Sequence, residues 1–151
     1  MGPRAMRRSF GTVLCATLAM GLLWTPVVAA HATTSAPVTI RVLRNGNDTW
    51  WAEGAFVDQG TFVDDPGFFA GQSNTYHVFR TFTAAGGAFV ARADVRILPT
   101  SDDSRLAVGG PWAVVSSTGD LAGLHGAGWV NEVIDLNVGQ ISGSWSGSVQ
   151  L

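Results

Sequence analysis

Apolar and polar residues alternate along short runs of this chain, and Gly, Asp and Pro interrupt the runs. The strictest alternation lies in residues 141–149, where serines occupy one face and Ile, Trp, Val and Gly occupy the other. Residues 88–98 alternate almost as well, with Phe89 among the apolar positions and Arg92 opposite them. Such alternation is typical of a strand that buries one face and exposes the other. The pattern therefore predicts antiparallel β-structure.

Turn-forming residues divide the chain into about eight predicted strands. Residues 45–48 read Asn-Gly-Asn-Asp, which favours a tight hairpin, and residues 84–87 supply a second turn. Residues 58–60 are interpreted as a break between strands, and residues 64–69 as a loop that ends in the apolar pair Phe68-Phe69. The predicted strands with the clearest limits are residues 38–43, 49–57, 74–83, 88–98, 112–117, 125–130 and 141–149.

The predicted fold class is all-β, because residues 33–151 contain no helical pattern of three turns. We expect a small antiparallel up-and-down β-barrel of about eight strands, with a two-sheet sandwich as the alternative. The preference for a barrel rests on the 19 glycines, many of which fall inside predicted strands. Glycine allows a small sheet to bend sharply enough to close on itself.

Residues 1–32 are predicted to be a cleavable signal peptide, and residues 33–151 the β-barrel domain. Three arginines precede an apolar run at residues 11–24, and Ala30-His31-Ala32 has the small-x-small form of a cleavage site. The apolar run is short for a transmembrane helix, so no stable membrane insertion is expected. We therefore expect a secreted, extracellular protein. The pair Arg7-Arg8 is compatible with the general secretory route or with twin-arginine export.

Charge and composition exclude several classes of partner. The chain has no Lys, and beyond the predicted signal peptide six arginines face all 11 acidic residues, a formal charge of −5. Nucleic acids and anionic membranes are bound chiefly by concentrated positive charge, so neither is an expected partner. The single Cys, Cys15, lies in the predicted signal peptide, which leaves the domain without thiol chemistry. Because His77 and His125 do not form a cluster with metal-ligand spacing, no metal or other cofactor is expected.

Aromatic side chains and a few polar groups within strands are the candidate ligand-binding residues. Trp and Phe rings could line a cavity for a small apolar molecule, or they could fill the core of a small barrel. Tyr76 and Arg80 share one face of a predicted strand, where Arg80 could fix a ligand carboxylate, whereas Arg92 is interpreted as an outer-face residue. The predicted ligand-binding residues are Trp51, Glu53, Tyr76, Arg80, Trp112, Trp129 and Trp145.

Glu53 and Tyr76 are the two candidate catalytic residues. Glu53 stands within a strand, and burial in an apolar lumen would favour its protonated form and allow it to act as an acid or base. The alternative is a solvent-facing Glu53 that pairs with an arginine on a neighbouring strand. A nucleophilic Ser is not indicated, because no Gly-x-Ser-x-Gly turn leads from a strand into a helix.

Three segments carry a family resemblance: residues 53–61, EGAFVDQGT; residues 81–89, TFTAAGGAF; and residues 112–128, which end in STGDLAGLHGAG. They resemble secreted bacterial proteins with an allene oxide cyclase/dirigent-like barrel. The last segment is similar to a GTG-x-aromatic-AG-x-x-G turn that commonly follows a strand in that superfamily. It departs from the pattern at Ser117, where Gly is usual, and at Leu121, where an aromatic residue is usual.

The resemblance implies an eight-stranded antiparallel barrel with an apolar cavity, in which relatives fold a reactive substrate or orient radicals. The acid and thiol of the plant cyclases have no counterparts that can be matched here, because residues 33–151 contain no Cys and Glu53 does not align with the family's acid. The favoured function is a secreted barrel that binds a small apolar ligand in its lumen without chemistry. The alternatives are an isomerase or cyclase, and a carbohydrate- or surface-binding module that uses exposed Trp residues and Phe68-Phe69.

Overall fold

The computed structural model describes residues 34–65, 67–69 and 74–151. The predicted signal peptide, residues 1–32, lies outside the described residues. In the part of the chain that is described, no helix is long and apolar enough to cross a membrane. The strands are β1 (Ala36–Arg44), β2 (Asp48–Gly54), β3 (Asp58–Asp64), β4 (Phe68–Phe69), β5 (Thr75–Ala84), β6 (Gly87–Leu98), β7 (Arg105–Gly119), β8 (His125–Asp135) and β9 (Gln140–Gln150).

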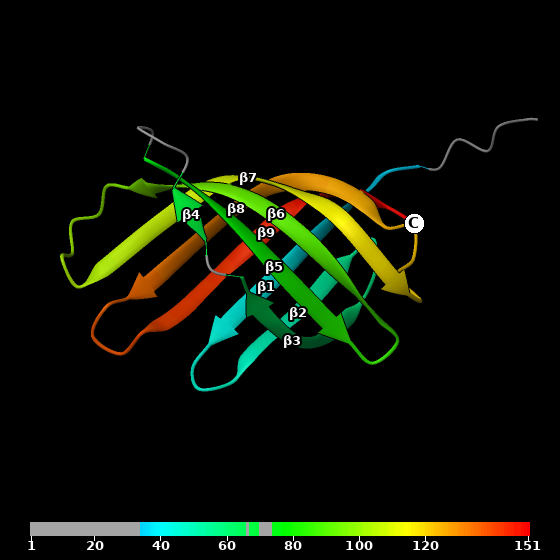
Figure 1. Cartoon of the computed structure of the whole chain (residues 1–151), viewed down its shortest axis with the longest axis horizontal. Helices are drawn as coiled ribbons and strands as arrows, with labels where there is room; N and C mark the ends of the chain where they lie inside the picture. Colours follow the sequence, from blue (N-terminus) through cyan, green and yellow to red (C-terminus); the bar gives the residue numbers. More distant parts are fainter. Residues whose placement is uncertain (1–33, 66, 70–73) are drawn as a thin grey trace, which may run out of the picture. The chain divides into compact units, whose positions relative to one another are not determined.

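Eight strands form one closed antiparallel barrel, and the short β4 adds to it at one end (Figure 1). Apart from β3 and β4, strands adjacent in sequence pair with one another, and β1 pairs with β9 to join the first strand to the last. Closure is completed by β3, which pairs with β5, while β4 pairs with β5 further along at Phe68 and His77. The predicted all-β barrel of about eight strands is therefore confirmed, and the sandwich alternative is wrong.

The hairpin predicted at residues 45–48 is present, since Arg44 pairs with Asp48 across it and Gly46 has a φ of 101°. The prediction that residues 58–60 interrupt the strands is wrong, because all three belong to β3. Gly60 belongs there because a Cβ at this position would lie 1.8 Å from the Thr83 carbonyl oxygen. A glycine inside a strand therefore marks close approach of two backbones rather than a turn.

Two other predicted boundaries also move. The strand expected to start at Trp112 is the second part of β7, which begins seven residues earlier at Arg105. The pair Phe68-Phe69, expected in a loop, forms β4. By contrast, β9 has the predicted alternation, with Ile141, Trp145 and Val149 buried.

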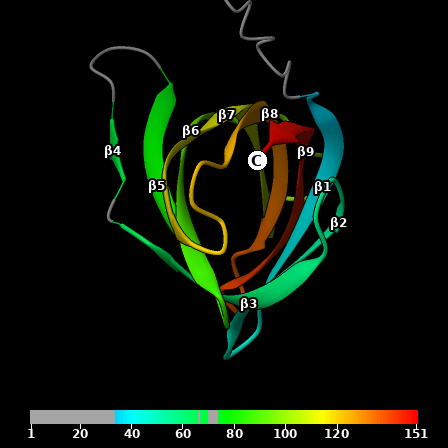
Figure 2. The same cartoon turned by 90° about the vertical axis from the view of Figure 1, so that its right-hand side faces the viewer.

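Aromatic rings fill the barrel at the end that carries the β7–β8 connection. Phe82 and Phe89 stack with centroids 4.6 Å apart, and Trp50 meets both rings edge-on at 5.6 and 5.7 Å. Leu121 and Leu124, from the connection itself, are buried in the same core cluster. Figure 2 shows this connection lying across the end of the barrel. This end is therefore closed by side chains.

Candidate functional site

A cavity of about 580 Å³ occupies the other end of the barrel. It lies where β5, β7 and β9 begin and where β3, β6 and β8 end. The lining residues are chiefly apolar, and the polar ones are Asp64, Asp65, Tyr76, Arg80 and Glu132. The apolar part of the wall comprises Val78, Ala93, Val95, Ile97, Leu106, Val108, Ile134, Ile141 and Trp145.

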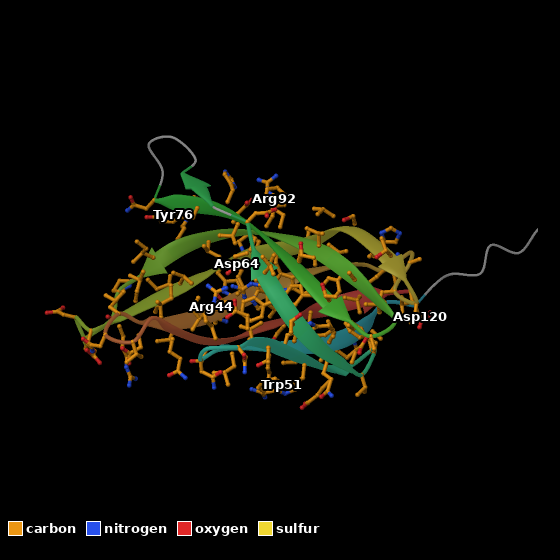
Figure 3. All side chains as sticks on the ribbon, turned by 60° about the horizontal axis from the view of Figure 1, so that its bottom comes forward. Arg44, Trp51, Asp64, Tyr76, Arg92 and Asp120 are labelled. Atoms are coloured by element: carbon orange, nitrogen blue, oxygen red, sulfur yellow. The ribbon has the colours of Figure 1, made fainter. Side chains whose placement is uncertain are left out.

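A cluster of charged residues adjoins this wall, centred on the buried Arg80, whose exposed fraction is 2%. Arg80 donates to Asp64 through Nε at 2.5 Å and Nη2 at 2.9 Å, and its Nη1 donates to Glu132 Oε1. Trp145 Nε1 also donates to Glu132 Oε1, at 2.7 Å. Arg44 Nη2 lies 3.3 Å from Asp64 Oδ2, and Figure 3 labels the two residues close to one another. We call Arg80, Asp64, Glu132 and Arg44 the charged cluster.

The surroundings keep Arg80 positively charged despite its burial. Burial alone would lower the pKa of Arg80, but the hydrogen bonds and negative charges of Asp64 and Glu132 outweigh it and raise the pKa above its usual range. The guanidinium carbon also lies 4.4 Å from the centroid of the Phe62 ring and 5.1 Å from that of Trp145, where cation–π attraction is favourable.

The charge balance of this region is unfavourable to an anionic ligand. Arg44 is matched by Asp48 as well as Asp64, and the hydrogen bond to Asp48 is the main cause of its raised pKa. Two arginines therefore face three carboxylates. All three nitrogens of the Arg80 guanidinium already donate to carboxylates, so a ligand carboxylate would have to displace one of them. Carboxylate oxygens can each accept more than one hydrogen bond, so a ligand donor suits this region better.

Three of the predicted ligand-binding residues meet at the cavity: Tyr76, Arg80 and Trp145. A fourth, Trp112, is 2% exposed and lies behind Trp145, with ring centroids 6.0 Å apart. Trp112 does not line the cavity, and its Nε1 has no hydrogen-bond partner among the described residues. Its role in the described part of the barrel is core packing.

The other three predicted residues lie on the outer wall. Trp51 is 38% exposed and Trp129 is 50% exposed, and Glu53 is also exposed. Figure 3 shows the Trp51 side chain projecting away from the barrel. Acid-base chemistry in the lumen would require the Glu53 side chain to point inward, but alternation along β2 directs it outward. Of the two candidate catalytic residues, Tyr76 alone lines the cavity.

Arg92 lies on the outer wall, as predicted. Its Nε and Nη2 donate to the two oxygens of Asp94 at 3.0 and 3.1 Å, and Asp94 Oδ1 is 2.5 Å from His77 Nδ1. Burial alone would raise the pKa of Asp94, but the hydrogen bonds from His77 and Arg92 outweigh it and lower the pKa. This triad joins β5 to β6 on the outside of the cavity wall.

Sequence reasoning does not single out Asp64 or Glu132, although a signal for both is present. Glu132 shares its strand face with the fully buried Val130, and Asp64 shares its face with the buried Phe62. A carboxylate on an otherwise apolar strand face must find a buried partner. Arg80, on β5, is that partner both for Asp64 on β3 and for Glu132 on β8.

In the described ranges, no group of three or more His, Cys, Asp or Glu residues is arranged to hold a metal ion.

No family model matches the chain, and neither does any curated protein or solved structure. The class of protein is therefore defined by its fold, a closed eight-stranded antiparallel β-barrel with an aromatic core at one end and a cavity at the other.

Proposed function

We propose that this protein binds a small, mainly apolar molecule that carries a hydroxyl group, and that it does so in the cavity without chemistry. The observation that supports the proposal is an apolar wall that meets two carboxylates at one place, the buried Glu132 and the partly buried Asp64. The cavity volume of about 580 Å³ falls within the usual range for small-molecule sites. The apolar body of the ligand would contact the Val, Ile and Leu side chains, which supply affinity through burial.

The polar end of the ligand is expected to donate a hydrogen bond. Asp64 and Glu132 have spare lone pairs, and the excess of negative charge disfavours an anionic group. A neutral hydroxyl therefore fits better than the carboxylate considered from the sequence alone. Loss of that hydroxyl would leave the desolvated carboxylate oxygens with one hydrogen bond fewer.

Isothermal titration calorimetry with three matched probes tests this function. We expect 1-naphthol to bind most tightly, naphthalene roughly ten- to hundredfold more weakly, and 1-naphthoate most weakly of all, because one hydrogen bond to a charged group contributes about 1.5 to 3 kcal/mol. Absence of saturable binding by all three probes would contradict the proposal. Tighter binding of 1-naphthoate than of 1-naphthol would contradict the assignment of a donor.

A pair of size-matched variants assigns the binding to the cavity. Val78 lines the cavity on β5, whereas Val63 is 64% exposed on β3. Val78→Phe should reduce the affinity for 1-naphthol at least tenfold by occupying the space, and Val63→Phe should leave it unchanged. Equal effects of the two substitutions would place binding elsewhere.

An isomerase or cyclase is a second candidate, favoured by the position of Tyr76 in the same cavity as Asp64 and Glu132. A phenol and carboxylates around one apolar space could shape a reactive substrate and move a proton. Turnover of a reactive unsaturated epoxide should then fall with Tyr76→Phe while 1-naphthol binding remains. Glu53→Gln serves as the control, because Glu53 lies on the outer wall. Unchanged turnover in Tyr76→Phe would remove Tyr76 from this role.

We infer that the chain is an exported member of the allene oxide cyclase/dirigent-like superfamily. The sequence order of the barrel strands supports this membership, as does the position of the Gly-rich turn, whose Gly119 and Gly123 have φ values of 64° and 91° between β7 and β8. N-terminal sequencing of protein from the culture medium should begin at Thr33. Recovery of the intact chain from the cytoplasm alone would contradict export, and dependence of export on Arg7 and Arg8 would identify the twin-arginine route.

A further inference from the structure

A second hollow, of about 410 Å³, lies on the outer wall of the barrel, across β2, β1, β9, β8 and β7. Exposed side chains that line it include Trp51, Arg41 and Asn131, and Ser144 lies between the last two. We call this hollow the outer cleft. Its exposed side chains lie on the outward face of the strands, and the buried Val108 and Glu132 border both this hollow and the cavity inside the barrel.

The strand registers place the cleft residues in one continuous row. Trp51 pairs with Arg41, Arg41 with Ser144, Ser144 with Asn131, and Asn131 with Gly109. The row ends at the buried Gly109, where an added Cβ would lie 3.0 Å from Leu98 Cδ1 and 3.3 Å from Asn131 Oδ1. Ser144 is the small residue between Arg41 and Asn131, so these two longer side chains stand on either side of it.

Two exposed indole rings flank the row from different strands. Trp51 lines the cleft on β2, and Trp129 stands on β8 just beyond the lining residues, two residues from Asn131 on the same outward face. Three interstrand spacings separate β2 from β8 in the sheet, a span of about 14 Å. Two exposed rings at this separation can both contact an extended ligand, whereas a compact ligand would reach only one of them.

The polar groups of the cleft are available for hydrogen bonding. The other five arginines in the described residues each have a hydrogen-bond or ion-pair partner, namely Arg44, Arg80, Arg92, Arg96 and Arg105. Within the same residues, neither Arg41 nor Asn131 has a side-chain hydrogen bond or ion pair. Arg41 presents a fork of N–H donors and Asn131 presents both a donor and an acceptor, a combination suited to neighbouring hydroxyl groups.

We propose that the outer cleft binds a polysaccharide chain built of pyranose rings. The apolar C–H face of such a ring stacks on an indole, and its hydroxyls exchange hydrogen bonds with Arg, Asn and Ser side chains. A nucleic acid is disfavoured, because Arg41 is a single cation in a domain of formal charge −5. A protein partner is disfavoured by the polar Arg, Ser and Asn residues at the centre of the row, since the central residues of protein interfaces are more apolar and depleted of charge.

Co-sedimentation of the purified protein with cellulose, with chitin and with insoluble calcium polygalacturonate tests the proposal. Saturable retention on at least one of them is expected, and the three supports distinguish a neutral, an N-acetylated and an acidic polymer. Trp51→Ala and Trp129→Ala should each weaken retention roughly two- to tenfold, the effect of losing one aromatic stacking contact. The double variant should lose most of the retention.

The matched control is Val115→Ala, which removes an exposed apolar side chain from the outer wall of β7 at a site that does not line the cleft. It should bind the polysaccharide as the unsubstituted protein does. All variants should keep their thermal unfolding midpoint and their affinity for 1-naphthol, so the outcome is independent of the function proposed for the cavity. Absence of retention on all three supports, or equal retention by the double variant, would overturn the proposal.

Discussion

At the end of the barrel that carries the β7–β8 connection, aromatic rings fill the interior, whereas at the opposite end the same strands leave a cavity of about 580 Å³. The difference follows from side-chain size along individual strands. On β5, the inward position in the closed end is Phe82, and that in the open end is Val78. On β6, the corresponding positions are Phe89 and Val95. A barrel of constant strand number can therefore be solid at one end and hollow at the other.

Arg80 marks the boundary between the two ends. It lies between Phe82 and Val78 on the inward face of β5, in contact with the Phe62 ring and paired with two carboxylates. A buried ion cluster is costly unless every member is paired, so its position is set by where the partners meet. Ion pairs therefore stabilise the boundary, whereas ring packing stabilises the closed end.

The largest expected effect is on the closed end. Phe82→Ala should lower the free energy of unfolding by about 4 kcal/mol, because it removes a fully buried ring that contacts Phe89, Trp50 and Trp145. Val78→Ala, on the same strand in the open end, should cost only about 1 kcal/mol, because its side chain already borders open space. Urea denaturation of both variants measures the difference, and equal losses would mean that the two ends are packed alike.

A slightly smaller effect is expected at the boundary. Arg80→Met should lower the free energy of unfolding by about 3 kcal/mol, because it leaves Glu132 buried without a cation. Adding Glu132→Gln should restore at least about 1 kcal/mol, since the neutral amide still offers an oxygen to Trp145 Nε1 while Asp64 retains Arg44. A double variant no more stable than Arg80→Met would show that charge burial is not what destabilises the single variant.

The smallest effect is expected on the outer wall of the open end. Asp94→Asn should cost less than about 1 kcal/mol near pH 7, since the triad with His77 and Arg92 is partly exposed. Folding lowers the pKa of Asp94, so its contribution is complete above the unfolded pKa of about 4 and is lost as the pH falls through the folded value. Stability measured from pH 7 to pH 2 should therefore fall less in Asp94→Asn than in the unsubstituted protein. Parallel curves would contradict this role.

The sequence predicts the barrel well because strand alternation and turn residues are local signals. The pattern at residues 141–149 correctly identifies the buried face that contains Trp145. For other strands, the sequence does not show which of the two faces is buried. Trp50 and Trp51 are adjacent, so one must face inward and the other outward, and the pairing of Trp51 with Arg41 and Gln59 on the outer wall decides which. Trp50 is the core residue and Trp51 the exposed one.

The site was harder to predict, since its residues come together only when distant strands meet. Asp64 and Glu132 are separated from Arg80 by 16 and 52 positions. Trp129 is a predicted ligand-binding residue, and it lies on the outer wall because the adjacent Val130 faces the core. The neighbouring inward position, Gly128, has no room for a side chain, because a Cβ there would lie 2.1 Å from the Ser146 carbonyl oxygen. Such steric limits depend on strand pairing and are invisible in a single sequence.

The pairing of β1 with β9 has a consequence for the order of events in folding. Ala36 pairs with Val149, so the contact that joins the first strand to the last closes a loop of more than one hundred residues. Every other pairing in the ring connects strands much closer in sequence. Hairpins can therefore form early, but the ring cannot close until β9 has left the ribosome. Such late, non-local closure is typical of slow folding, and loss of the final strand would expose two unpaired edges at once.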